Sequence, residues 1–396
     1  MRVFYAEANY GDEEIDAAIK VLKEERLALM SGKNVSELES RVAKIFRKDF
    51  GVMTNSGSSA NLLAVKGLSL PNGSKVITPS LTFSTTVAPL VQSDLIPFFV
   101  DVELDTLQID IQKLKTIDLD EVSAICVPNL IGNIANWEEI ANFAEANHLL
   151  VIEDSADTIG YDYKTTKQDW ADVTTTSFYA SHVVTGAGFG GMATFRDEKH
   201  YNLAKSLRGW GRRSSQYGET EDYTRRFDCK VSGFDYDDKY VFDDLGYNFL
   251  PSEISAAFAL IQLNHLEENI KNRWENFNLL QSAVSKSDNF GTFKAYDNVY
   301  TGWLAFPMIL TNKLKGKRKE FQIFLEKAGV QTRTIFTGNI LRQPVAEKFK
   351  WDSHGSFEVS DEIMQNGLLL GCHNQMTKEK MDFMIEKVME AESALA

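Results

Sequence analysis

The sequence is poor in cysteine and in positive charge, and each shortage argues against a class of protein. Its three cysteines, Cys126, Cys229 and Cys372, lie far apart and form no CxxC pair, so neither a disulfide framework nor a zinc site is indicated. Unpaired thiols are typical of a reducing compartment. The net charge of −14 argues against nucleic acid or an anionic membrane as the main partner, because both require a basic surface.

Long apolar runs are also lacking. No run reaches the roughly 18 residues that a membrane span needs, and the first residues turn acidic without the apolar stretch of a signal peptide. We therefore expect a cytoplasmic protein. With 396 residues the chain exceeds what one hydrophobic core usually holds, which predicts two domains.

Short apolar runs alternate with helical stretches from about residue 50 onward. Two amphipathic helices, 11–24 and 35–46, come first, and later helices are predicted at 58–68, 84–92 and 136–147. The apolar runs are VMT, KVITP, IPFFVDV, SAICVPNL, LLVIEDSA, TTTSFYAS and GGMATF. This alternation predicts an α/β fold with a mostly parallel, doubly wound sheet, which binds ligands outside the carboxyl ends of its strands.

The second half of the chain starts with a charge-rich segment at 208–246, which is too long for an idle loop. Its seven aromatic residues from Tyr217 to Phe242 favour a functional flap over disorder. Residues 252–273 predict one strong amphipathic helix leading into a smaller α+β domain. We expect a large domain at 1–250, with the flap at 208–246, and a small domain at 251–396.

Polar residues follow the first two predicted strands where ligands should bind. Gly57 and Ser58 stand where a strand turns into a helix, and free N–H groups beside a hydroxyl suit a phosphate. Phe83 follows the next strand and could stack on a flat ring. Each residue also has an ordinary structural explanation, as a common turn or as core filler.

Two later strand ends add acids and a histidine. Asp154 and Asp157 follow an apolar strand, and such a carboxylate could hold a protonated ring nitrogen. Metal binding and simple solvation are the alternatives. Ser177 and His182 then flank a short turn. The glycine-rich stretch after them leads into a strand, so it is no dinucleotide fingerprint. Taken in order, these residues predict a site for a phosphorylated, aromatic, electron-sink cofactor.

With these motifs the chain resembles the DegT/DnrJ/EryC1/StrS sugar aminotransferase family, which has the aspartate-aminotransferase fold (fold type I). The resemblance covers nearly the whole chain and includes SGKNVSELESRVA, TNSGSSANLLAV, TPSLTFSTT, FFVDVELDT, VIEDSAD, SFYAS, GYNFLPSEISAAFALIQL and LLLGCHNQMTKE. It implies pyridoxal 5′-phosphate or pyridoxamine 5′-phosphate as cofactor.

The chain departs from that family at one position. The family motif SFxxxK supplies a lysine that binds the cofactor aldehyde, whereas this sequence has His182 there and no lysine between Lys167 and Lys199. With a histidine at this position, the chain resembles the branch of the family formed by the 3-dehydratases of nucleotide-linked 4-keto-6-deoxy sugars. Asp157 of EDSAD, the segment FDYDDKYVFDDLGYNF and FTGNILRQP also resemble that branch, in which deoxysugars such as those of lipopolysaccharide O-antigens are made. With only three cysteines, the chain is similar to the subgroup without an iron–sulfur cluster.

The resemblance implies roles for individual residues. Gly57, Ser58 and Ser177 would hold the cofactor phosphate, Phe83 would stack on the ring, Asp154 would pair with the ring nitrogen, and Asp157 would lie beside the cofactor. Asn248 would reach the phosphate across the interface of a homodimer. Separately, Arg208, Arg212 and Arg213, with Arg225 and Arg226, could clamp the diphosphate of a nucleotide-linked keto sugar, although solvated surface arginines are the more ordinary interpretation.

A histidine in place of lysine changes the expected reaction. Imidazole cannot tether the cofactor aldehyde, yet it still acts as a base near neutral pH. We therefore expect loss of the sugar's C3 hydroxyl with His182 as the base, and glutamate as the amino donor that regenerates the amine form. The alternatives are a sugar aminotransferase, in which His182 is an engineered substitution or Lys164, Lys167 or Lys199 reaches the site, and a binder of cofactor or sugar nucleotide without catalysis.

Overall fold

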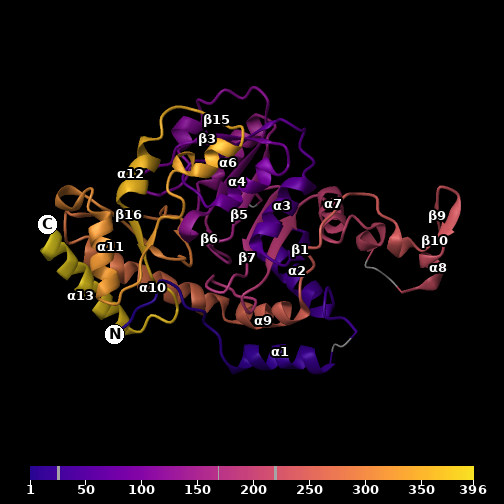
Figure 1. Cartoon of the computed structure of the whole chain (residues 1–396), viewed down its shortest axis with the longest axis horizontal. Coiled ribbons are helices and arrows are strands. Elements are labelled where there is room, and N and C mark those ends of the chain that lie inside the picture. The colour runs from indigo at the N-terminus through magenta and orange to yellow at the C-terminus, as the bar shows by residue number, and fades with distance from the viewer. Residues whose placement is uncertain (25–26, 168, 218–220) are drawn as a thin grey trace.

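The computed structural model describes residues 1–24, 27–167, 169–217 and 221–396. Its centre is an eight-stranded sheet in the order β1-β8-β7-β5-β4-β2-β3-β15 (Figure 1). Neighbouring strands from β7 to β15 are parallel, whereas β8 is antiparallel to β1 and β7. The strands are β1 (Phe50–Thr54), β2 (Lys75–Pro79), β3 (Ile96–Val100), β4 (Val122–Pro128), β5 (Leu150–Ser155), β7 (Val173–Ser177), β8 (Gly191–Phe195) and β15 (Asp352–Ser353). The predicted mostly parallel α/β sheet is confirmed.

Helices cover both faces of this sheet, as the alternation of side chains along a strand requires. In β4, Ile125 and Val127 pack into one core, and Ala124 and Cys126 pack into another on the opposite face. The first core includes residues of α2 (Lys33–Ile45), α6 (Trp137–Ala146) and α9 (Glu253–Asn264), and the second includes residues of α3 (Gly57–Gly67), α4 (Ser84–Val91) and α7 (Glu198–Arg208). Helix α1 (Asp12–Glu24) packs on α9, and α5 (Ile111–Leu114) is a single turn.

The prediction of one helix over 252–273 is wrong. The chain forms α9 and α10 (Leu266–Val284), which are separated at His265, whose φ and ψ of −100° and 8° end the first helix. The apolar pattern does not reveal this break, because Leu263 and Leu266 on either side of it are buried in the same core. The break lets α10 leave the large sheet and run to the C-terminal part of the molecule (Figure 1).

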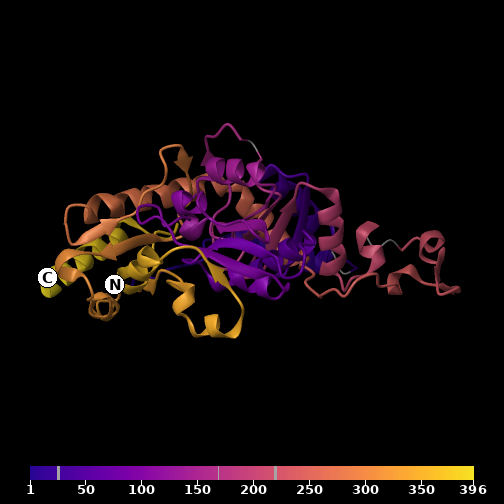
Figure 2. The same cartoon turned by 90° about the horizontal axis from the view of Figure 1, so that it is seen from above.

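A second, antiparallel sheet in the order β11-β13-β16-β14 organises the C-terminal part. Trp303, Phe306 and Phe321 lie in its separate core. Both chain ends lie at this end of the molecule (Figure 2). The elements are β11 (Phe290–Thr292), β13 (Phe306–Leu310), β14 (Arg333–Thr334), β16 (Gly367–Leu370), α11 (Arg318–Lys327), α12 (Glu358–Asn366) and α13 (Lys378–Leu395), and a small ladder joins β6 (Asp162–Tyr163) to β12 (Val299–Tyr300).

The chain crosses between the two parts more than once. Helix α9 belongs by packing to the large sheet, and β15 extends that sheet from the C-terminal part by pairing with β3. The carboxylate of Asp101, which follows β3, accepts hydrogen bonds from the backbone N–H groups of Val359 and Ser360 at the start of α12 (3.1 and 3.0 Å). We retain the division into 1–250 and 251–396 as a proposal.

The segment 208–246 protrudes from the large sheet beyond α7 (Figures 1 and 2). Residues 218–220 within it lie outside the described residues. The others form α8 (Tyr223–Arg226) and a hairpin of β9 (Cys229–Val231) and β10 (Phe234–Tyr236). Ion pairs of Arg213 with Asp243 and of Arg226 with Asp237 hold the protrusion together. Its apolar side chains are largely exposed, including those of Tyr223, Phe227, Phe234 and Tyr240.

No helix among the described residues is long and apolar enough to cross a membrane.

A buried carboxylate joins the predicted motifs SGKNVSELESRVA and LPSEISAAF. Helix α2 receives no side-chain cap from its own N-cap residue, Gly32. Instead Glu253 of α9 accepts hydrogen bonds from the backbone N–H groups of Asn34 and Val35 (3.0 and 2.9 Å) and from the Asn34 side chain (2.7 Å). Because Glu253 is fully buried, its charge must be satisfied by these donors and by the positive end of the α2 dipole.

We predict that Glu253→Ala lowers the free energy of unfolding by about 2 kcal/mol or more, because it leaves buried N–H groups of α2 unsatisfied. Urea unfolding followed by circular dichroism measures this. The control is Glu267→Ala, which removes an exposed carboxylate from the first turn of α10. Equal unfolding midpoints for the two variants would show that Glu253 does not cap α2.

Candidate active site

A cavity of about 620 Å³ lies at the carboxyl ends of β5 and β7, where the sheet topology predicts a ligand site. It brings together seven of the residues singled out in the sequence: Gly57, Ser58, Phe83, Asp154, Asp157, Ser177 and His182. Its other walls are Tyr5, Asn55, Ser56, Asn61, Thr85, Thr86, Pro128, Leu130, Ala156, Tyr179, Ser181, Gly188, Phe189, Gly190, Leu304 and Phe336. We call this cavity the active-site pocket.

Asp154 is a buried carboxylate at the floor of the active-site pocket. One of its oxygens accepts hydrogen bonds from Asn61 Nδ2 (2.9 Å) and Thr86 Oγ1 (2.8 Å), and the other accepts from the Ala156 N–H (3.2 Å). Burial raises the pKa of Asp154, and these hydrogen bonds oppose that rise by favouring the ionised form. Such a carboxylate is suited to hold a protonated nitrogen of a ring placed above it.

Gly57 begins α3 directly beside Ser177 at the end of β7. The N-cap residue Ser56 accepts a hydrogen bond from the Ser59 N–H at 3.1 Å, which fixes the helix start. A Cβ atom at position 57 would lie 2.7 Å from the Cβ of Ser177, so only glycine allows this close approach. The first N–H groups of a helix have no acceptor within it, and with the hydroxyls of Ser58 and Ser177 they make a cradle of donors whose chemistry suits a phosphate.

Phe83 closes one side of the active-site pocket. It is the N-cap residue of α4 and its ring is half exposed, at 49%. The ring meets that of Phe336 edge to face, with centroids 5.6 Å apart. An aromatic ring left open to a cavity offers a surface on which a flat ligand can stack.

Asp157 lies beyond Asp154 on the same side of the sheet. It accepts a hydrogen bond from the backbone N–H of Ile131 at 2.7 Å. Burial raises the pKa of Asp157 to about 7. The hydrogen bond from Ile131 lowers this pKa, and the negative charge of Asp154 raises it further. Around neutral pH this carboxyl group can therefore donate as well as accept a hydrogen bond.

His182 lies in the turn after β7 and lines the active-site pocket. Its Nδ1 is 3.4 Å from the carbonyl oxygen of Ser177, and its ring meets that of Tyr179 edge to face at 5.7 Å. Burial lowers the pKa of His182 to about 4, and the Ser177 carbonyl opposes this shift while Arg273 adds to it. The imidazole is therefore neutral at physiological pH, which is the form that accepts a proton.

The predicted arginines do not line the active-site pocket of the same chain. Arg208 is buried and pairs with Glu39 at 2.7 Å, and its guanidinium also donates to the Met53 carbonyl. Arg212 lies over the Trp210 ring, and Arg213 makes two hydrogen bonds with Asp243. Arg225 and Arg226 lie on α8 in the protruding segment, and Asn248 is exposed outside the active-site pocket.

Three important residues of the active-site pocket were missed in the sequence. Asn61 and Thr86 stand four and three residues after Gly57 and Phe83, so helical spacing could have placed them one turn further along the same helices. Tyr5 reaches the pocket from the N-terminal segment, which the sequence did not connect with the sheet. No local signal in the sequence reveals that contact.

The residues of the active-site pocket fit pyridoxal phosphate or pyridoxamine phosphate. The cradle at Gly57, the open face of Phe83 and the hydrogen-bonded carboxylate of Asp154 match its phosphate, ring and ring nitrogen. No lysine lines the pocket among the described residues, and Lys164, Lys167 and Lys199 lie elsewhere on the surface.

Comparison with known proteins agrees with this geometry. The chain is 31% identical to the lipopolysaccharide biosynthesis protein RfbH of Salmonella typhimurium, over 91% of this chain and 86% of that protein. It is 30% identical to the GDP-4-keto-6-deoxy-D-mannose 3-dehydratase of Escherichia coli O55:H7, over 96% and 98%.

A crystal structure of GDP-4-keto-6-deoxymannose-3-dehydratase with a trapped PLP-glutamate geminal diamine is also similar. It superposes with a TM-score of 0.87 at 26% identity and covers 98% of this chain and all of that one. The model of the DegT/DnrJ/EryC1/StrS aminotransferase family matches residues 9–389, and the chain therefore belongs to this family.

Proposed function

We propose that the protein is a 3-dehydratase that uses pyridoxal phosphate and pyridoxamine phosphate to convert a nucleotide-linked 4-keto-6-deoxy sugar to a 4-keto-3,6-dideoxy sugar. The observation that carries this proposal is the position of His182. It stands where the family motif SFxxxK has lysine, and it lines the same pocket as Phe83 and Asp154. The chain is similar to one protein named as a 3-dehydratase and to another named as a lipopolysaccharide biosynthesis protein, and both similarities support the proposal.

The residues of the pocket have separate tasks in this reaction. When bound, the cofactor would supply an amine toward the sugar ketone and a ring that accepts electrons. Asp154 would keep the ring nitrogen protonated, and the cradle at Gly57, Ser58 and Ser177 would hold the phosphate without a covalent tether. His182, being neutral, accepts a proton at the cofactor face and can deliver it to the departing C3 hydroxyl.

The same pocket argues against the two alternatives. An aminotransferase of this family needs a lysine within reach of the cofactor, and none lines the pocket among the described residues. A binder without catalysis has no need of a neutral base directed at the cofactor site. The glutamate adduct in the similar crystal structure supports glutamate as the amino donor here.

We further propose a homodimer that works in the cytoplasm. The exposed aromatic side chains of the segment 208–246 and the exposed Asn248 lie outside the chain's own pocket, which suits contact with a second copy. In that arrangement Asn248 reaches the partner's phosphate cradle, and Arg212 and Arg213 approach its substrate. The three cysteines are unpaired, as in proteins of reducing compartments.

We predict that His182→Asn reduces dehydration by at least about 100-fold, because asparagine cannot accept the proton. Release of 3-deoxy product from a panel of 4-keto sugar nucleotides, measured by mass spectrometry, tests this. His148→Asn, at an exposed position, serves as control and should keep full turnover. Unchanged turnover in His182→Asn would show that another group is the base.

We predict that His182→Lys restores a covalent link to the cofactor and shifts the protein toward amino transfer. The lysine amine would lie where the imidazole now faces the cofactor site. Borohydride reduction followed by mass spectrometry should find the cofactor attached to residue 182 in the variant and no attached cofactor in the unmodified protein. Absence of the adduct in the variant would mean that position 182 does not face the cofactor aldehyde.

We predict that His182 stays neutral in the cofactor-free protein as the pH falls from 8 to about 5. Its pKa is lowered from 6.5 to about 4, so the unfolded chain binds this proton more readily than the folded one, and the stability contributed by this group falls as the pH drops from about 6.5 to about 4. NMR titration of labelled histidine side chains, with His182→Asn to assign the signal, measures the pKa. Titration near 6.5 would contradict the assigned burial.

A further inference from the structure

A buried arginine lies behind the active-site pocket. Arg273, on α10, is 2% exposed, and in the part of the chain that the structure describes no carboxylate acts on its charge. Its ionisable neighbours are Tyr5 and Cys372. Burial raises the pKa of both groups, that of Cys372 to about 12, so both stay protonated and neutral at physiological pH. A buried cation without a counterion destabilises a fold, and residues that break such a rule are expected at functional sites.

The guanidinium of Arg273 is held by backbone carbonyl groups alone. Its Nη1 donates to the carbonyl oxygens of Trp303 (3.1 Å) and Leu304 (3.2 Å), and its Nη2 donates to that of Ser181 (3.4 Å). Its buried Nε has no hydrogen-bond partner. The side chain thus joins α10 to two segments that are far apart in the sequence.

One of these segments is the turn that carries the proposed base. Ser181 directly precedes His182, and both residues line the active-site pocket. Within the turn, the backbone N–H of His182 donates to the Tyr179 carbonyl (3.0 Å), and the imidazole has only the long contact with Ser177 described above. Arg273 adds a hydrogen bond that reaches the turn from a different element.

The other segment is a rigid anchor. Trp303 is fully buried, and its ring stacks on that of Phe277 with centroids 4.0 Å apart. Phe277 follows Arg273 by one helical turn, so both side chains lie on the same face of α10. Leu304, which lines the active-site pocket, donates its backbone N–H to the Ile131 carbonyl (2.9 Å). Arg273 therefore ties the His182 turn to a wall that is itself fixed.

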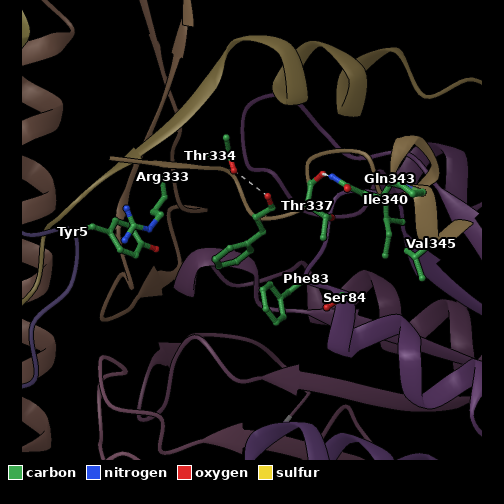
Figure 3. Close-up of a pocket in the computed structure, with 11 residues that line it drawn as sticks. Tyr5, Phe83, Ser84, Arg333, Thr334, Thr337, Ile340, Gln343 and Val345 are labelled. Atoms are coloured by element: carbon green, nitrogen blue, oxygen red, sulfur yellow. Dashed lines mark hydrogen bonds between the residues drawn. The ribbon is translucent and has the colours of Figure 1, made fainter. Parts of the chain in front are cut away.

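Arg273 also sets the charge around His182. The other titratable groups that line the pocket with His182 are Tyr5, Asp154, Asp157 and Tyr179. A second arginine, Arg333, lines a neighbouring cavity and lies over the Tyr5 ring, 5.4 Å from its centroid (Figure 3). The pKa of His182 responds to burial first and then to the Ser177 carbonyl and to Arg273, but not to Arg333. A positive charge behind an imidazole opposes its protonation.

We propose that Arg273 is a positioning residue for His182, which it serves by tying the Ser181 carbonyl to the Trp303–Leu304 wall and by placing a positive charge behind the imidazole. This inference rests on the proposed function, because it takes His182 to be the base of the reaction. The tie keeps the imidazole directed into the pocket, and the charge keeps it in the form that accepts a proton.

Two substitutions separate the charge of Arg273 from its geometry. Arg273→Met removes the charge, so the ratio of kcat/KM at pH 5 to kcat/KM at pH 8 should fall at least about twofold, because more of His182 is protonated at pH 5. Arg273→Lys keeps the charge and should keep this ratio. Its ammonium cannot hold both segments as a planar guanidinium does, so kcat should fall at least about tenfold at both pH values. Turnover of the accepted 4-keto sugar nucleotide by the cofactor-loaded protein measures both effects.

NMR titration of labelled histidine side chains in the full-length protein without added ligand provides a readout that needs no turnover. The pKa of His182 should be at least about 0.5 higher in Arg273→Met than in the unsubstituted protein, and it should stay low in Arg273→Lys. The matched control is Arg318→Met. Arg318, on α11, also donates to a backbone carbonyl, that of Gly367 (3.4 Å), but it lies outside the active-site pocket. This control should change neither the titration nor the pH dependence.

Three results would overturn the proposal. The first is an unchanged titration of His182 in Arg273→Met. The second is an equal rise of this pKa in Arg273→Met and Arg273→Lys, which would assign the effect to a loosened core. The third is full kcat in Arg273→Lys, which would show that the guanidinium does not position the turn. Should Arg273→Met fail to fold, Arg273→Lys decides alone, and either full kcat or titration of His182 near 6.5 would then count against the proposal.

Failure of the proposed function gives a different result. If the protein dehydrates no keto sugar, yet the pKa of His182 rises in Arg273→Met and not in Arg273→Lys, the reaction is wrongly assigned. The electrostatic control of His182 by Arg273 would still stand.

Discussion

The arrangement of the site depends on the need to satisfy one buried charge. Asp154 is removed from water at the end of β5, and an ionised carboxylate there is stable only with several donors around it. Those donors come from two helices, Asn61 on α3 and Thr86 on α4. By meeting this need, the helices are held in a fixed position over the sheet. Gly57 at the start of α3 and Phe83 at the start of α4 are thereby both placed in the wall of the same cavity.

We call β5, α3 and α4, which meet at Asp154, the frame of the site. His182 lies beside this frame, but its side chain does not hold these elements together. Its ring has one weak polar contact, at 3.4 Å from the Ser177 carbonyl, whereas Asp154 has three hydrogen bonds. A residue so lightly held can be exchanged without disturbing the frame, which explains how one family can carry lysine or histidine at this place. In the proposed reaction this frame would bind the cofactor, and the residue at position 182 would select what the bound cofactor does.

The site residues that lie at strand ends could be predicted from the sequence, because the topology of a parallel sheet gathers those ends on one edge. Sequence reasoning therefore placed Gly57, Phe83, Asp154, Ser177 and His182 in one cavity. It could not place contacts made between distant segments. Tyr5 and Arg333 reach the cavities from the N-terminal segment and from β14, and neither belongs to a periodic pattern that points to a ligand. The break at His265 was hidden for a similar reason, because burial continues without interruption across it.

The strand β15 has a consequence for how ligands come and go. Because this strand is hydrogen-bonded into the large sheet and Asp101 caps α12 from that sheet, the C-terminal part is tied to the N-terminal part at points far from residue 250. A wide hinge opening between them would break these backbone hydrogen bonds. Exchange of product for fresh substrate then relies on local motion around the active-site pocket and not on a wide separation of the two parts of the molecule.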